Sequence, residues 1–81
     1  MGLLDGSKAL VTGGARGNGA GIGRGLADNG ADVVLSDIDG ETVTSAAKDI
    51  AKVTGQQVSG IAADVGDPAD VQTMIDETVS Q

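Results

Sequence analysis

The stretch that decides the fold spans residues 9–19 and reads Ala-Leu-Val-Thr-Gly-Gly-Ala-Arg-Gly-Asn-Gly. It joins a short apolar run to a turn that is rich in glycine. A second apolar run, residues 33–35, ends shortly before Asp37, eighteen residues after Gly19. An apolar run, a glycine turn, a segment of helical length and another apolar run are typical of a strand–helix–strand unit with parallel strands.

The rest of the chain continues this alternation of strands and helices. We predict strands at residues 8–12, 32–36 and 57–63, and helices at residues 19–29, at 41–53 and from 68 onward. Gly30 and Gly55 are suited to end the first two helices, while Asp67 and Pro68 are suited to begin the third. The predicted fold class is α/β: a Rossmann-type βαβαβα half with a three-stranded parallel sheet in the order 3-2-1. Right-handed crossovers place the first two helices on one face, and the third folds back over the other.

The second helix is predicted to carry its apolar residues on one face, and the third helix is predicted to bury such a face. In the second helix this face comprises Val43, Ala46, Ala47, Ile50 and Val53. In the third helix it comprises Val71, Met74, Ile75, Thr78 and Val79.

Composition limits the classes of function that the chain supports. The 81 residues are sufficient for one domain, residues 1–81, and contain no Phe, Tyr, Trp, Cys or His. Disulfide, thiolate and imidazole chemistry are therefore excluded within this sequence, and no metal site is predicted. The net charge of −7 argues against nucleic acid or an anionic membrane as a partner. We see no signal peptide and no membrane span, so we expect a cytoplasmic protein.

The glycines offer two registers for a Gly-x-x-x-Gly-x-Gly turn, beginning at Gly13 or at Gly17. The helix after the turn must run back about as far as the strand is long, roughly 16 Å for five residues. A helix over residues 19–29 supplies about 15 Å, whereas one that starts at residue 23 supplies only about 9 Å. The first register is therefore favoured. It assigns the tight turn to Gly13, and the approach of a pyrophosphate and of the helix to Gly17 and Gly19.

Strand, glycine turn, helix and strand-end acid together predict a dinucleotide site. Asp37 would accept hydrogen bonds from the hydroxyls of the adenine ribose, and its charge would repel a 2′-phosphate. This favours NAD over NADP, as does the absence of Lys or Arg just after Asp37, whereas Arg16 favours NADP. Asp64 ends the third strand, with Val65 after it, where the adenine is expected.

Thr12-Gly13-x-x-x-Gly17-x-Gly19 resembles the cofactor fingerprint of the short-chain dehydrogenase/reductase family. Residues 3–11 and the segment Ala63-Asp64-Val65 resemble that family too. The resemblance implies that Gly13, Arg16, Asn18 and Gly19 lie near the phosphates, Asp37 and Ile38 near the ribose, and Asp64 and Val65 near the adenine. Asn18 departs from the pattern, because the family usually has Ile or Leu there.

The resemblance also implies that the family's catalytic Ser and Tyr-x-x-x-Lys pair lie beyond residue 81. We therefore expect the NAD-preferring cofactor half of an oxidoreductase, inactive by itself. One alternative is half of a split oxidoreductase, and another is a folding or assembly unit with a vestigial site. A methyltransferase-type adenosyl site agrees less well with the leading Thr-Gly. The first strand would form an exposed edge, so we expect a homodimer through it.

Overall fold

The structure is a computed structural model and describes residues 3–14 and 17–80. Strands and helices alternate along the chain, as the sequence predicts. The elements are β1 (Lys8–Thr12), α1 (Gly17–Asp28), β2 (Asp32–Asp37), α2 (Gly40–Thr54), β3 (Val58–Ala62) and α3 (Pro68–Ser80).

The three strands form one parallel sheet in the order β1-β2-β3. This is the predicted order 3-2-1 read from the opposite edge. The central strand β2 pairs Leu10 with Val34 on one side and Leu35 with Gly60 on the other. In the described part of the chain, β1 pairs only with β2 and therefore has one free edge.

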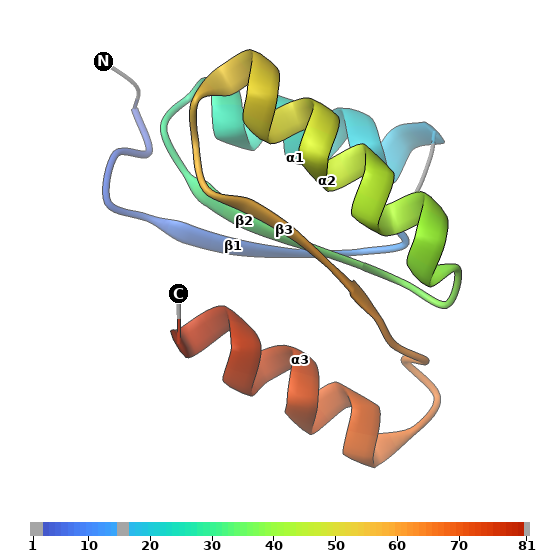
Figure 1. Ribbon diagram of the computed structural model, residues 1–81. Helices are drawn as coiled ribbons and strands as arrows, with labels where there is room; N and C mark the ends of the chain where they lie inside the picture. The colour runs from blue at the N-terminus through green and yellow to red at the C-terminus, as the bar shows by residue number, and fades with distance from the viewer. Residues whose placement is uncertain (1–2, 15–16, 81) are drawn as a thin grey trace.

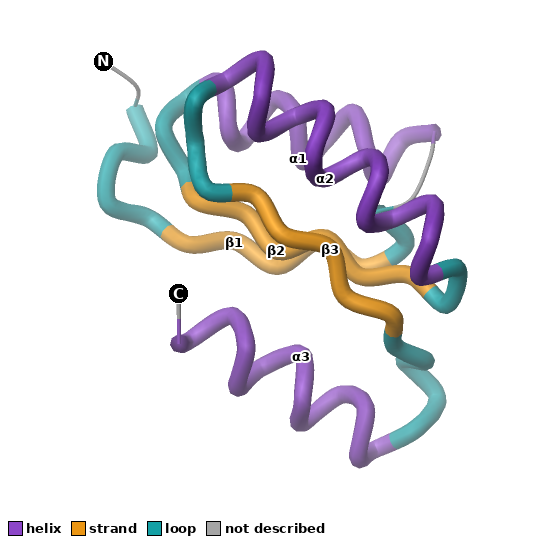
Figure 2. The backbone as a smooth tube through the Cα atoms, in the orientation of Figure 1, coloured by secondary structure: helices purple, strands orange, loops and turns teal. Residues whose placement is uncertain are grey.

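The helices cover both faces of the sheet. Helices α1 and α2 lie together on one face, and α3 runs back alone across the opposite face (Figure 1). Figure 2 shows the same three layers, with the strands between the helix pair and α3. The predicted placement of the helices is confirmed, as expected for right-handed crossovers between parallel strands.

The main core lies between the sheet and the helix pair. Val33, Leu35 and Val43 are fully buried there, and Ala27 and Ala47 fill the smaller spaces between the elements. Because side chains alternate along a strand, Val34 and Ser36 of β2 lie on the opposite face, the one that α3 covers. Met74 is the buried apolar side chain that α3 contributes to that second layer.

Both predicted apolar helix faces are narrower than expected. Val53 is 61% exposed, because ten residues at about 100° each place it about 80° away from Val43 around α2. On α3, Ile75 is 46% and Val79 is 71% exposed. A sheet of three short strands covers only the side chains of α3 on the same face as Met74. The predicted burial of Ile75 and Val79 is therefore wrong, and Val53 lies beside the buried part of the α2 face to which it was assigned.

Side chains at the helix ends fix where the helices begin and stop. Asp39 caps α2 by accepting a hydrogen bond from the Thr42 N–H at 3.1 Å, a cap that the sequence prediction missed. Gly55 ends α2 in the left-handed conformation, with φ of 74°, as predicted. Asp67 accepts a bond from the Ala69 N–H at 2.9 Å at the start of α3. Within the described residues, no helix has the length and apolar character needed to cross a membrane.

Candidate functional site

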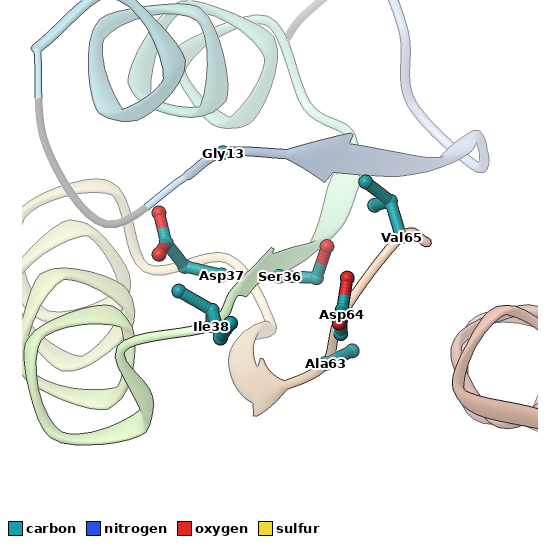
Figure 3. A pocket seen from close by; sticks show the side chains of 7 residues that line it. All are labelled: Gly13, Ser36, Asp37, Ile38, Ala63, Asp64 and Val65. Atoms are coloured by element: carbon teal, nitrogen blue, oxygen red, sulfur yellow. The ribbon is translucent and has the colours of Figure 1, made fainter. Parts of the chain in front are cut away.

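A pocket of about 250 Å³ opens at the carboxyl ends of the three strands (Figure 3). Its walls come from the turn after β1, the end of β2 with the residue after it, and the segment after β3. Parallel strands place all their carboxyl ends at one edge of the sheet, where open α/β folds bind ligands. The lining residues are Gly13, Ser36, Asp37, Ile38, Ala63, Asp64 and Val65.

The glycine turn connects the pocket to the start of α1. Gly13 and Gly17 have φ of 67° and 63°, a backbone conformation that side chains with a Cβ rarely adopt. The N–H of Gly14 donates to the carbonyl of Ser36 at 2.8 Å, which ties the turn to β2. A Cβ on Gly19 would overlap the carbonyl oxygen of Gly13, whereas one on Gly21 would meet nothing within 4 Å. This geometry agrees with the register that begins at Gly13.

Asp37 ends β2 and is half-buried at the pocket. Its Oδ1 accepts a hydrogen bond from the backbone N–H of Asp39 at 3.1 Å. Figure 3 shows its carboxylate directed toward the side of the pocket where Gly13 lies. Ile38, the next residue, is 75% exposed at the rim. The Asp39 cap on α2 fixes the turn that follows β2, and so fixes the position of Asp37 relative to the pocket.

Asp64 lies two residues beyond the end of β3 at Ala62, so the prediction that it ends the third strand is wrong, because Ala62 rather than Asp64 pairs with Asp37. The N–H of Gly66 donates to Asp64 Oδ1 at 2.8 Å, and the N–H of Asp64 donates to Asp70 Oδ2 at 2.9 Å. The first turn of α3 therefore helps to hold this segment in place. Val65 beside it is 62% exposed. With Asp37, Asp64 gives the pocket two carboxylates, which disfavour a bound phosphate between them.

Sequence reasoning missed two residues of the lining, Ser36 and Ala63. Ser36 is only 1% exposed, and its Oγ has no hydrogen-bond partner among the described residues. A signal was available, because Ser36 is the one polar residue inside the run that leads from Val33 to Asp37. Ala63 is buried, and its N–H donates to the carbonyl of Asp37 at 3.0 Å, which joins the ends of β2 and β3.

The predicted site residues fall into two groups. Gly17, Asn18 and Gly19 belong to the first turn of α1 and do not line the pocket, and Arg16 lies outside the described residues. The rest meet in the pocket: Gly13, Asp37, Ile38, Asp64 and Val65.

The pocket and the helix start suit the two parts of a dinucleotide. A helix start with unpaired N–H groups favours phosphates, and strand-end carboxylates favour hydroxyl and amino groups. Among the described residues, no group of three or more Asp and Glu side chains is arranged to hold a metal ion.

Known proteins resemble this chain along nearly all of its length. The sequence profile described as short chain dehydrogenase matches residues 7–81. The sex determination protein tasselseed-2 of Zea mays is 44% identical over 78 residues, which are 96% of this chain and 22% of that protein. A versicolorin reductase of Emericella nidulans is 41% identical over 76 residues, 94% of this chain and 29% of that protein. The chain thus spans less than a third of the length of these relatives.

Solved structures give the same result in three dimensions. A hydroxysteroid dehydrogenase from Escherichia coli superposes with a TM-score of 0.89 at 30% identity, over 95% of this chain and 32% of that one. A 7α-hydroxysteroid dehydrogenase was solved in complex with NADH and 7-oxo glycochenodeoxycholic acid. It superposes with a TM-score of 0.88 at 30% identity, over 95% of this chain and 30% of that one. The sequence match and the structural superpositions agree. The chain belongs to the short-chain dehydrogenase family.

Proposed function

We propose that this chain binds NAD as the cofactor-binding part of a short-chain dehydrogenase/reductase. The observation that carries the proposal is the pocket at the carboxyl ends of the strands, where Gly13, Asp37 and Asp64 come together. These residues come from three separate segments of the sequence. The fold brings them to one place beside the glycine-rich start of α1, as a bound dinucleotide requires.

Each part of the site has a distinct role in this proposal. The start of α1, with Gly17 and Gly19, receives the pyrophosphate on its backbone N–H groups. Asp37 accepts hydrogen bonds from the hydroxyls of the adenine ribose, and Asp64 with Val65 lies against the adenine. NAD bound in this way supplies hydride transfer, while the protein supplies binding and orientation.

The preference for NAD over NADP rests on charge at the end of β2. Asp37 lies at the pocket, Asp39 and Glu41 follow it, and the first basic residue after it is Lys48. A 2′-phosphate on the ribose would meet these carboxylates without a basic side chain from this segment. The NADH in the structure of the 7α-hydroxysteroid dehydrogenase supports a nicotinamide dinucleotide as the ligand.

The oxidoreductase reaction also needs groups that these residues do not include. The chain spans 22–29% of the two relatives compared above and contains no Tyr. In this proposal the proton donor and the substrate pocket come from sequence outside the 81 residues, so the chain alone binds NAD without oxidising or reducing a substrate.

Calorimetric titration of NAD and NADP into three proteins tests the proposal: the unaltered chain, Asp37→Ala and Asp49→Ala. Asp49 is exposed on α2 outside the pocket, so its variant makes the same charge change as a control. We expect NAD to bind more tightly than NADP. Loss of hydrogen bonds to a charged group corresponds to about 1.5–3 kcal/mol, so Asp37→Ala should weaken NAD binding by about 10- to 150-fold. Equal NAD affinity in all three proteins, or tighter binding of NADP by the unaltered chain, would contradict it.

A further inference from the structure

Ser36 carries a buried hydroxyl that nothing in the described protein satisfies. The residue is 1% exposed, and its Oγ lacks a hydrogen-bond partner. Buried polar groups in native proteins are almost always paired, so an unpaired one in the lining of a pocket requires an explanation. We propose that Ser36 is a binding residue whose hydroxyl is satisfied by the adenine of the bound dinucleotide. This inference rests on the proposed function.

The direction of the side chain supports this role. Ser36 and Asp37 are neighbours in β2, and successive side chains of a strand point to opposite faces. Figure 3 shows the Asp37 carboxylate on the side of Gly13, and the Ser36 hydroxyl on the side where Asp64 and Val65 lie. In this proposal the two residues therefore contact different parts of one ligand. Asp37 faces the side proposed for the ribose, and Ser36 faces the side proposed for the base.

Among residues 3–14 and 17–80, no protein group makes a hydrogen bond with the Ser36 hydroxyl. The buried residues on its side of the sheet, Val34 and Met74, are apolar. Thr12, which pairs with Ser36 in the sheet, makes no hydrogen bond with the Ser36 hydroxyl. The backbone carbonyl of Ser36 already accepts from the Gly14 N–H at 2.8 Å. Oδ1 of Asp64 is engaged with the Gly66 N–H. The hydroxyl is therefore left for a group that enters from the pocket.

The ligand must uncover the hydroxyl as it binds, because the Oγ has almost no accessible surface in this structure. Asp64 and Val65, which line the same side, are both exposed, so their side chains have room to move away. A hydroxyl both donates and accepts hydrogen bonds, and adenine offers ring-nitrogen acceptors beside an amino donor. The exposed Ile38 and Val65 supply apolar contacts for the faces of such a flat ring.

The test uses Ser36→Ala, with Ser45→Ala as the matched control on the exposed surface of α2. Circular dichroism melts are recorded without ligand, and NAD and ADP-ribose are titrated by calorimetry. Because Ser36→Ala removes an unpaired hydroxyl, its melting temperature without ligand should be unchanged or higher. We expect both ligands to bind this variant about 5- to 10-fold more weakly, by the same factor, because both contain adenosine. Ser45→Ala should bind as the unaltered chain does.

Each other outcome counts against the inference in a distinguishable way. Unchanged affinity of Ser36→Ala would overturn it while leaving the proposed function intact, provided that Asp37→Ala still weakens binding. A lower melting temperature without ligand would show a structural role for Ser36 instead. An effect on NAD but not on ADP-ribose would place the contact outside the adenosine. If the unaltered chain binds neither ligand, both the inference and the proposed function fail.

Discussion

Two glycines in the first turns of α1 should respond in opposite directions to the same substitution. A Cβ on Gly19 would overlap the carbonyl oxygen of Gly13, and its next neighbours are also backbone atoms, with the Gly14 Cα at 3.1 Å. Backbone cannot rotate away as a side chain can, so Gly19→Ala must displace α1 from the turn. Overpacking of this kind costs about 1–3 kcal/mol. A Cβ on Gly21 meets nothing within 4 Å, so Gly21→Ala should stabilise the helix by roughly 0.5–1 kcal/mol.

Thermal melts followed by circular dichroism at 222 nm measure both effects. A change of 1 kcal/mol shifts the melting temperature of a domain this size by about 4–8 °C. We therefore expect Gly19→Ala to melt at least 4 °C below the unaltered chain, and Gly21→Ala to melt above it. The two variants also test the register of the glycine turn, because in the rejected register Gly21 would be one of the glycines that the pyrophosphate and the helix approach closely. Destabilisation by Gly21→Ala together with tolerance of Gly19→Ala would refute the reasoning.

Further predictions concern the core, a helix end and the free edge of the sheet. Leu35→Ala removes a fully buried side chain between β2 and the helix pair and should cost about 2–5 kcal/mol in urea unfolding; a loss below 1 kcal/mol would contradict its central place in the core. Gly55→Ala places a Cβ in open space at φ of 74°, so backbone strain alone should cost about 1–2 kcal/mol, and an unchanged melting temperature would argue against the left-handed cap. We also propose a homodimer through the free edge of β1, which light scattering should detect as twice the chain mass; a monomer at high concentration would exclude it.

The sequence was sufficient to predict the order of elements and the residues around most of the pocket. Glycine and proline at the ends of elements and short apolar runs are local signals. They predicted the bounds of β1 at residues 8 and 12, where the structure has them. The position of Asp37 after an apolar run was sufficient to place it at the carboxyl edge, because all strands of a parallel sheet end there. That reasoning needs only parallel strands, which the alternation of strands and helices along the chain predicts.

What the sequence did not predict depends on packing between distant segments. Val53 and Val79 are apolar and belong to the predicted faces, yet three short strands leave them exposed. Ser36 was missed because its burial depends on residues after β3 and on α3. The structure begins α1 at Gly17 rather than at Gly19, and Gly17 itself has a positive φ of 63°, which a spacing argument does not register. The exposure of Val53 and Val79 and the burial of Ser36 depend on tertiary packing, although the position of Ser36 inside an apolar run was a local signal for it.

The most direct test of the central claim is a map of backbone amide shifts in the ¹H–¹⁵N NMR spectrum as NAD is added. The account predicts that the changes cluster at the carboxyl edge of the sheet, in residues 12–14, 17–19, 36–38 and 63–66. Gly30 and Gly55, which precede β2 and β3 at the opposite edge, should not change. Shifts centred on that opposite edge, or no shifts at millimolar NAD, would contradict the assignment of this pocket as the dinucleotide site.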